Sequence, residues 1–564
     1  MGIKDDLTNY GDDGFAEFLR TAFASSMGYS DEILSRPVVG ITFTASDFNN
    51  CHRQVPELVE AVKRGVLASG ALPMVFPTMS LGEGFLTPTS MYFRNLMAME
   101  TEELIRGQPM DAVVLIGGCD KTLPAQTMAA LSAGKPAIVL PVGPMSTGRF
   151  EGERLGACTD CRRYWGRYRA GGIGEDELAS VRGNLASTSG TCPVMGTAST
   201  MACLLETMGL TVPMAATIPS VHADRLRAAE QTGVVAARLA TEGGPLPADL
   251  VTAASLENAL RVLLAVGGST NALVHLTAIA RRAGIRIDLD RFNELSAETP
   301  VVVSLKPVGA SYMEDLHAAG GVPAVLRELQ DLLDLDVPTV GGPTLGDVVG
   351  HAPAWTDREV VATASEPFDA EGGLIALFGT LAPDGAILKR GAATPELFER
   401  TGRAVVFTSL ADLAERIDDP DLDVTADDFL VLQNAGPLAA GMPEAGYLPI
   451  PKKLLKQGVT DMVRLSDARM SGTAYGTVVL HIAPEAAAGG PLGLVRDGDL
   501  IRLSVAEQRL DLLVDAEELA RRVPAETVRL VGDRPAGYAW VFQQHVMQAP
   551  DGADFDFAMP EGTP

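Results

Sequence analysis

Basic residues are scarce in this sequence of 564 residues. Lysine and arginine together number 45 against 72 aspartates and glutamates, which leaves a formal net charge of −27. A charge of this size repels polyanions, so nucleic acid is excluded as a partner. A small anionic substrate would need local positive charge from a metal ion, a lysine or an arginine.

Long apolar runs are also lacking. No run approaches the roughly 20 residues that a membrane-spanning helix requires. The first residues, MGIKDD, have neither the basic start nor the apolar core of a signal peptide. We therefore expect no association with membranes and a cytoplasmic location.

Cysteine is sparse as well, with six residues in the whole chain, too few for a dense disulfide framework. Cys51, Cys119 and Cys192 each lie in a polar or glycine-rich loop that follows a predicted strand or opens a predicted helix. Their wide separation excludes a local zinc knuckle. Three such loops meeting at one end of a sheet could hold an iron-sulfur cluster with one iron position open. The alternative is three separate buried cysteines.

The first two thirds of the sequence alternate between short apolar runs and helical periodicity. Strands are predicted at 37–43, 72–76, 112–116 and 137–140, and helices at 55–67, 90–105, 124–131, 198–208, 223–240, 256–266 and 271–283. This alternation is typical of parallel β-α-β units. The polar segment 149–190 is expected to wrap the surface.

Helical periodicity fades between residues 340 and 370, and we place a domain boundary at about residue 365. Short apolar runs follow at 374–378, 404–407, 429–433, 462–465, 478–482, 500–505 and 510–514, which favours a barrel or sandwich. The predicted fold is α/β, with an N-terminal parallel-sheet domain over residues 1–365 and a C-terminal β-barrel-like domain over 366–564. The tail after residue 548 is expected to be loosely held.

The stretch from Gly117 to Thr122 follows the apolar run 112–116 and places a thiol, a carboxylate and an amine side by side. Ligands of open α/β sheets bind outside the carboxyl ends of the strands, which is where this stretch lies. Glu83, Asp120 and Glu444 each stand beside glycine, proline or cysteine in a loop. If the fold brings them together they could hold magnesium; singly, each is a solvated acid.

Other polar residues carry weaker signals. The pair Cys158 and Cys161 forms a C-x-x-C without a second pair or histidines, and we interpret it as incidental. Ser471 occupies a Ser-Gly-Thr turn and could act as a base if a nearby metal lowers its pKa. His52 and His481 are interpreted as structural residues, and Cys203 as a core residue.

Several long strings of the sequence resemble one known family. They are FPTMSLGE, RNLMAMETEELIRGQPMDAVVLIGGCDKTLPA, GTCPVMGTASTMA, GGSTNALVH and DMVRLSDARMSGTAYGTVVLHIAPEAAAGGP. Together they resemble the dihydroxy-acid and sugar-acid dehydratases, over roughly residues 35 to 520. The resemblance implies the same two-domain fold, assembly as a homodimer or homotetramer, and a site between the domains.

The resemblance also implies roles for individual residues. Three groups follow from it: cluster ligands Cys51, Cys119 and Cys192; magnesium ligands Glu83, Asp120, Lys121 and Glu444, with Lys121 carboxylated on its amine; and Ser471 as the catalytic base, with Thr473 touching the substrate. A 2Fe-2S cluster is expected in preference to 4Fe-4S.

Within this family the strings GYLPIPKKLL and DARMSGTAYGTVVLH favour the sugar-acid branch, closest to its pentonate dehydratases for acids such as L-arabinonate or D-xylonate. The expected reaction converts an aldonate into a 2-keto-3-deoxy sugar acid. Two alternatives stay open. One is the dihydroxy-acid dehydratase of branched-chain amino-acid biosynthesis, whose substrate demands an apolar pocket. The other is a non-catalytic iron-sulfur protein.

Overall fold

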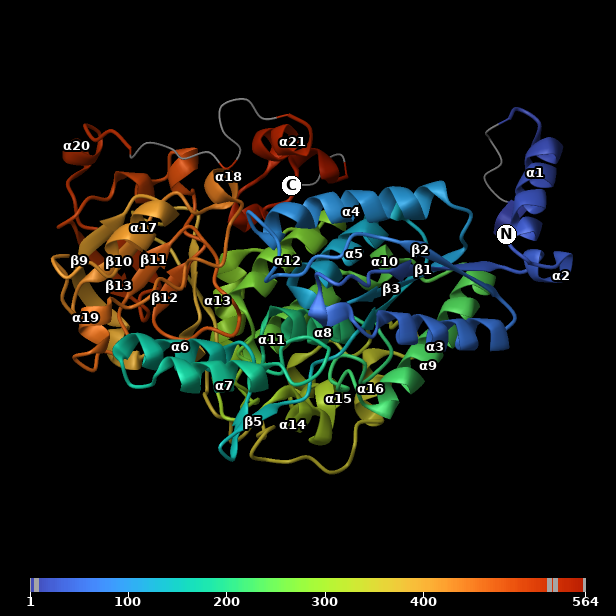
Figure 1. Cartoon of the computed structure of the whole chain (residues 1–564), viewed down its shortest axis with the longest axis horizontal. Coiled ribbons are helices and arrows are strands. Elements are labelled where there is room, and N and C mark those ends of the chain that lie inside the picture. The colour runs from blue at the N-terminus through green and yellow to red at the C-terminus, as the bar shows by residue number, and fades with distance from the viewer. Residues whose placement is uncertain (1, 5–9, 525–529, 531–535, 561–564) are drawn as a thin grey trace.

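The protein is built around two β-sheets that lie at opposite ends of the chain (Figure 1). The computed structural model describes residues 2–4, 10–524, 530 and 536–560. A small hairpin pairs β5 (Gly148–Phe150) with β6 (Glu153–Leu155). In the described residues no helix is both long and apolar enough to span a membrane.

The first sheet contains four parallel strands in the order β2-β1-β3-β4. They are β1 (Val38–Phe43), β2 (Leu72–Pro77), β3 (Ala112–Gly117) and β4 (Ala137–Pro141). All residues of β3 and β4 are buried, because helices cover both faces of the sheet. Strands of this kind appear in a sequence as continuous apolar runs, and the four predicted strands are confirmed.

Helices α3 (Val55–Ala68) and α9 (Ala223–Glu242) cover one face, and α4 (Ser90–Gly107) and α5 (Cys119–Ala133) cover the other (Figure 1). Glycines let α3 and α9 approach closely. A Cβ at Gly65 would lie 2.1 Å from the Glu230 carbonyl oxygen, and one at Gly233 would lie 2.2 Å from that of Val62. A side chain at either position would force the two helices apart.

The remaining helices surround this core. Buried helices α8 (Thr197–Thr207), α11 (Ala253–Ala265) and α12 (Thr270–Arg282) pack beside α5 or one another, close to the predicted bounds. The others are α1 (Asp13–Ser26), α2 (Asp31–Leu34), α6 (Thr159–Ala170), α7 (Glu175–Leu185), α10 (Pro247–Leu250), α13 (Leu289–Glu298), α14 (Met313–Ala318), α15 (Gly321–Glu328), α16 (Leu345–Gly350), α17 (Leu410–Arg416), α18 (Pro437–Ala440), α19 (Lys452–Leu455), α20 (Ala516–Leu519) and α21 (Tyr538–His545).

The second sheet has eight strands in the order β14-β13-β9-β10-β11-β12-β8-β7. They are β7 (Ile375–Leu377), β8 (Ala386–Leu388), β9 (Glu399–Phe407), β10 (Phe429–Leu432), β11 (Arg464–Ser466), β12 (Val478–Leu480), β13 (Leu500–Ser504) and β14 (Arg509–Leu512). Strands β9 to β12 run parallel and the outer pairs antiparallel. A bridge between Phe378 and Arg509 joins the two ends, so the sheet is barrel-like, as expected.

The expectation of a loosely held tail after residue 548 is wrong for the residues described there. Asp554 and Phe555 are fully buried. The Asp554 carboxylate pairs with Arg282 at 2.8 Å, and Arg94 donates hydrogen bonds to the carbonyl oxygens of Gly552 and Ala553. The tail is therefore fastened to α4 and α12, while residues 561–564 lie outside the described residues.

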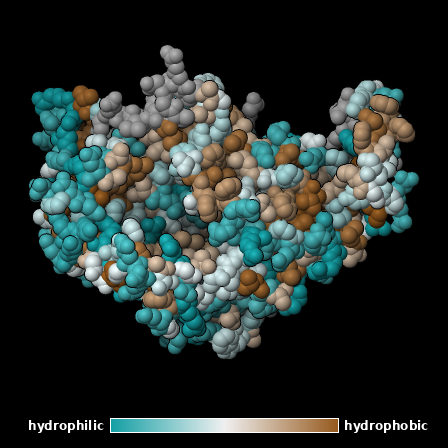
Figure 2. All heavy atoms as spheres, in the orientation of Figure 1, coloured by the Kyte–Doolittle hydropathy of each residue, from teal (hydrophilic) through white to brown (hydrophobic). Residues whose placement is uncertain are grey.

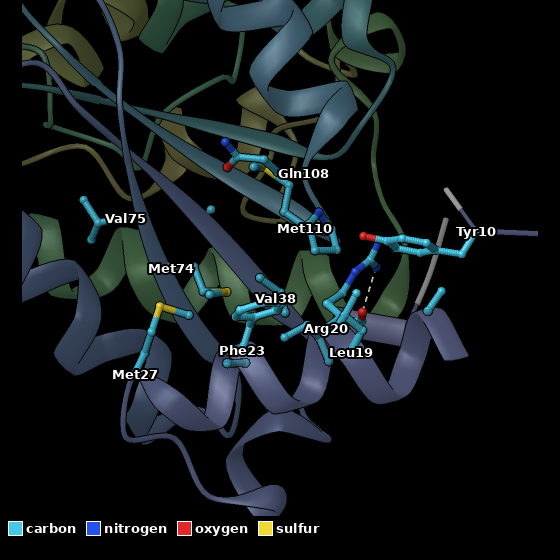
Figure 3. Close-up of a pocket in the computed structure, with 15 residues that line it drawn as sticks. Tyr10, Leu19, Arg20, Phe23, Met27, Val38, Met74, Val75, Gln108 and Met110 are labelled. Atoms are coloured by element: carbon cyan, nitrogen blue, oxygen red, sulfur yellow. Dashed lines mark hydrogen bonds between the residues drawn. The ribbon is translucent and has the colours of Figure 1, made fainter. Parts of the chain in front are cut away.

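Helix α1 stands out at one end of the molecule, where apolar side chains reach the surface (Figure 2). A cavity of about 420 Å³ lies between α1 and the edge of the first sheet (Figure 3). Phe23 and Met27 approach it from the helix, and Val38, Met74 and Met110 from the sheet side. None of the predicted site residues lines this cavity.

Candidate active site

The site begins where β3 ends and α5 starts. A Cβ at Gly118 would lie 2.2 Å from Val142 Cγ2, so the close packing at this position leaves room only for glycine. Cys119 follows with φ = 51°, a left-handed conformation that costs energy in any residue with a side chain. Such strain at a strand end is typical of functional residues. Cys119, Asp120 and Lys121 thus share the first turn of α5 rather than a loop.

A second cavity, of about 540 Å³, collects most of the predicted site residues. Those in its lining are Cys51, Cys119, Cys192, Glu83, Asp120, Glu444, Ser471 and Thr473. Lys121 is not in the lining, but it is fully buried behind it, with its Nζ 3.3 Å from Glu83 Oε2. Residues that are up to 422 positions apart in sequence, from Cys51 to Thr473, therefore meet at one place.

The thiols at this cavity interact in two pairs. A hydrogen bond between Cys51 and Cys119, together with burial, raises the pKa of Cys51. Cys158 Sγ lies 3.5 Å from Cys192 Sγ. Cys158 also lines the cavity, so our interpretation of Cys158 as incidental to the site is wrong. The C-x-x-C pattern gave no sign of this, because the contact is made with a distant cysteine and not with a second local pair.

In the second pair, hydrogen bonds decide which thiol loses its proton more readily. Those from Cys161 and Cys192 lower the pKa of Cys158, whereas the bond to Cys158 raises the pKa of Cys192. The bond to Cys158, and then burial, raise the pKa of Cys161. Thiolate is the form of cysteine that binds iron, and several converging thiols of which one ionises readily suit a cluster of iron and sulfide.

Three carboxylates also meet at this cavity. One oxygen each of Glu83, Asp120 and Glu444 lies within 4.8 Å of the others. Burial, and then the charge of Glu83, raises the pKa of Glu444 to about 7, and burial also raises that of Asp120. A cation offsets the repulsion between half-buried acids that crowd together in this way, and oxygen ligands of this kind suit a divalent ion such as Mg²⁺.

Arg469, which was not among the predicted site residues, supplies part of that positive charge. Its guanidinium donates to Glu83 Oε1 at 2.7 Å and to Glu444 Oε1 at 2.6 Å. Burial alone would raise the pKa of Glu83, but the charges of Arg469 and Lys121 outweigh it and hold that pKa well below its usual range. Arg469 therefore ties a loop of the first sheet's region to the second. The only signal in the sequence was an arginine two residues before Ser471.

Lys121 stands where it can join the acids. Its Nζ lies 3.3 Å from Glu83 Oε2 and 3.7 Å from Asp120 Oδ2, and its side chain has no exposed surface. A carboxyl group on this amine would replace the cation by a further oxygen ligand. The position of the residue fits that modification.

Ser471 and Thr473 form a tight turn at the cavity. Their hydroxyl oxygens lie 2.8 Å apart. A Cβ at Gly472 would lie 2.6 Å from Ser269 Cβ, so the turn packs directly onto the start of α12 and needs glycine at its centre. Thr159 Oγ1 donates to the Thr473 carbonyl oxygen at 2.9 Å.

Lys389 is a second residue that the sequence did not single out. It is fully buried at the end of β8, and its Nζ donates to the Gly472 carbonyl oxygen at 3.0 Å. Burial lowers the pKa of Lys389 to about 7. A buried lysine is costly, and this one is placed to hold the turn that carries Ser471.

His52 is also buried beside the site and serves the backbone. Its Nδ1 hydrogen-bonds with the Thr44 carbonyl oxygen at 2.9 Å, and its Nε2 accepts from the amide of Gly118 at 2.9 Å. His52 therefore fixes the turn before Cys119, which agrees with its interpretation as a structural residue.

Comparison with known proteins shows the family. Residues 36–348 match the model for the N-terminal part of dihydroxy-acid/6-phosphogluconate dehydratases, and residues 359–553 match the model for the C-terminal part. A 6-deoxy-6-sulfo-D-gluconate dehydratase of Pseudomonas putida is 44% identical over 540 residues, covering 94% of this chain and 93% of that protein.

Two other relatives are named for different substrates. An L-arabonate dehydratase of Azospirillum brasilense is 44% identical over 550 residues, covering 96% of this chain and 94% of that protein. A dihydroxy-acid dehydratase of Moorella thermoacetica is 36% identical over 518 residues, covering 90% and 93%. The chain therefore belongs to the dihydroxy-acid/6-phosphogluconate dehydratase family and is an enzyme of the dehydratase type.

Proposed function

We propose that this enzyme dehydrates a sugar acid, an aldonate, to a 2-keto-3-deoxy sugar acid. The observation that carries the proposal is the convergence of thiols, carboxylates and Ser471 on one cavity. The relatives named for sugar acids are 44% identical to this chain, against 36% for the dihydroxy-acid dehydratase of Moorella thermoacetica. This difference favours the sugar-acid branch.

Two metal groups belong to the proposal. Cys51, Cys119 and Cys192 would hold an iron-sulfur cluster, 2Fe-2S in preference to 4Fe-4S. The magnesium ligands would be Glu83, Asp120, Glu444 and a carboxylated Lys121. When bound, these groups supply Lewis acidity at the hydroxyl that leaves and at the substrate carboxylate and 2-hydroxyl.

Ser471 is proposed to take the proton from C2. Its Oγ lies at the cavity and is almost buried, and the Thr473 hydroxyl, 2.8 Å away, can donate a hydrogen bond to the alkoxide. As the C2–H bond breaks, its electron pair forms the C2–C3 double bond and the C3–O bond breaks. The departing hydroxide becomes water on protonation, and the enol that forms rearranges to the 2-keto acid. No oxidant or reductant is consumed.

The cavity lining offers a polyhydroxylated substrate several polar side chains, set among apolar ones such as Leu86 and Met145. Asn50, Thr89, Thr191 and Thr197 line it alongside the thiols and acids. Side chains of this kind can hydrogen-bond the hydroxyls of an aldonate. The runner-up is the branched-chain dihydroxy-acid dehydratase, whose substrate ends in an alkyl group.

A substrate panel tests the proposal. Anaerobically purified enzyme with Mg²⁺ is incubated with pentonates, hexonates and dihydroxyisovalerate, and the 2-keto acid product is measured. We expect turnover of one or more aldonates. Turnover of dihydroxyisovalerate alone would replace the proposal by the runner-up, and no turnover of any acid by a chain that carries its cluster would favour a non-catalytic iron-sulfur protein.

The same assay tests the base. Ser471→Ala should retain the visible absorption of the cluster and lose at least about 100-fold in kcat, because general-base catalysis contributes factors of this size. Thr408→Ala, in a turn away from the cavity lining, is the matched control and should keep normal turnover. An active Ser471→Ala variant would remove the serine from its proposed role.

Assembly as a homodimer or homotetramer is also part of the proposal. Helix α1 offers apolar surface that an assembly would bury: Phe18 is 69% exposed and Phe23 is 66% exposed. This helix carries Asp13, Glu17 and Arg20, so it adds little to the repulsion between two acidic chains. Sedimentation equilibrium measures the mass directly, and a monomer at micromolar concentration would contradict this point.

A further inference from the structure

We propose that Cys158 is a fourth thiol of the cluster site, so that four cysteines in two pairs hold the cluster while no substrate is bound. The inference rests on the proposed function only in requiring an iron-sulfur cluster in this cavity. It adds a ligand that the three-cysteine pattern of the sequence did not contain.

The arrangement of the sulfur atoms carries the inference. Cys51 and Cys119 are in hydrogen-bond contact, and Cys158 Sγ lies 3.5 Å from Cys192 Sγ. Two sulfurs bound to one tetrahedral metal at about 2.3 Å are about 3.8 Å apart. The Cys158–Cys192 distance therefore suits two ligands of a single iron, and with Cys51 and Cys119 in the same cavity lining the four thiols fit the Cys₄ arrangement of a 2Fe-2S cluster.

The surroundings hold Cys158 at the cavity. The residue stands directly before α6, and the next residue, Thr159, donates a hydrogen bond to the Thr473 carbonyl oxygen at 2.9 Å. The amide of Gly156 donates to Asp160 Oδ2 at 2.7 Å, and Asp160 itself is buried. Contacts on both sides of Cys158 thus fix the segment that presents its thiol.

The neighbouring cysteine, Cys161, differs from Cys158 in its position relative to the cavity. Cys161 contacts Cys158 but does not line the cavity. The two residues therefore give a matched pair of variants, one of a proposed ligand and one of a cysteine three positions away in the same helix turn.

A fourth thiol has a consequence for the resting enzyme. With three cysteines one iron position stays open to water and dioxygen, whereas Cys158 would occupy the place that the leaving hydroxyl needs. Substrate binding then competes with Cys158, and the cluster is shielded until substrate arrives.

The test compares wild type, Cys158→Ser and Cys161→Ser, each reconstituted anaerobically with ferrous iron and sulfide. Iron content, visible absorption and the electron paramagnetic resonance spectrum of the reduced cluster are measured without substrate. We expect equal iron in all three proteins, a changed spectrum only in Cys158→Ser, and several-fold faster bleaching of that variant in air. Thermal midpoints of the three proteins show that each is folded.

Each outcome decides the inference. Spectra and bleaching rates of Cys158→Ser that match those of wild type would overturn it, as would wild-type protein that takes up no cluster. If the Cys158→Ser spectrum differs from that of wild type but wild type turns over no sugar acid, this inference stands and the proposed function is refuted. If Cys158→Ser and Cys161→Ser change the spectrum and the bleaching rate equally, the effect comes from a disturbed α6, and the assignment of Cys158 as a ligand is overturned.

Discussion

Removing the amino group of Lys389 should make the protein more stable and less active. The side chain is fully buried and donates one hydrogen bond, to the Gly472 carbonyl oxygen at 3.0 Å. Among the described residues no carboxylate lies within the 4.0 Å of an ion pair with it. Lys389→Met keeps the aliphatic stem and removes the charge.

The magnitude follows from the pKa. Burial lowers the pKa of Lys389 from 10.5 to about 7, and this difference corresponds to about 5 kcal/mol at about 1.4 kcal/mol for each pH unit. Because the folded state holds the proton less tightly than the unfolded chain, the cost is complete below pH 7 and disappears as the pH rises towards 10.5. Linkage gives a cost of about 4 kcal/mol at pH 7 and about 2 kcal/mol at pH 9. Loss of the hydrogen bond to Gly472 costs the variant about 1 kcal/mol, which offsets part of this gain.

Urea titrations of wild type and Lys389→Met at pH 7, 8 and 9 measure this difference. The variant should be more stable by about 3 kcal/mol at pH 7, and its advantage should shrink by about 2 kcal/mol by pH 9. Its kcat should fall about 10-fold, because the turn between Ser471 and Thr473 loses its anchor. Lys456→Met, at an exposed lysine, is the control. An advantage that is the same at all three pH values would refute the reasoning.

Three further changes follow from buried groups. Arg469→Leu should destabilise the protein by removing the counter-charge of Glu83 and Glu444, by less than the roughly 3–5 kcal/mol of a fully buried pair because these carboxylates are 25% and 20% exposed. Added Mg²⁺ should raise the melting temperature of this variant more than that of wild type, and equal rises would contradict this hypothesis. Asp554→Ala should cost about 3–5 kcal/mol in urea titrations, whereas Asp551→Ala, at a carboxylate that is 40% exposed, should cost less than about 1 kcal/mol. Cys119→Ser should yield protein without the visible absorption of a cluster, and a brown variant with full iron content would remove Cys119 from the ligand set.

The parallel sheet could be predicted because its strands are buried on both faces. β1, β3 and β4 appear as continuous apolar runs with a helix after each of the first three strands. β8 escaped prediction because its apolar run is limited to the three residues Ala386–Leu388, whereas the predicted runs at 374–378 and 478–482 extend beyond their strands. Pairing with β12 and β7 makes this short run a strand. The tail was misjudged because its anchors, Arg94 and Arg282, lie hundreds of residues away in the sequence.

Some residues of the site could likewise be predicted from local sequence patterns, and others could not. Cys119 and Asp120 follow an obvious strand, so their position at its end could be inferred from local pattern alone. The convergence with Glu444 and Ser471 came only from resemblance to a family, since no periodicity relates the two halves of the chain. Cys158 and Arg469 were given no role because their partners, Cys192 and Glu83, are far away in sequence. The chemical roles of all these residues stay predictions.

The division of the site between the two ends of the chain has a consequence for biosynthesis. All four thiols precede Pro193, whereas Glu444, Arg469 and Ser471 are translated long afterwards. Because the N-terminal part of a chain folds first on the ribosome, a nascent chain would present the thiols of the proposed cluster before the proposed base, Ser471, is made. Metal loading can thus come before the enzyme is competent to turn over its substrate.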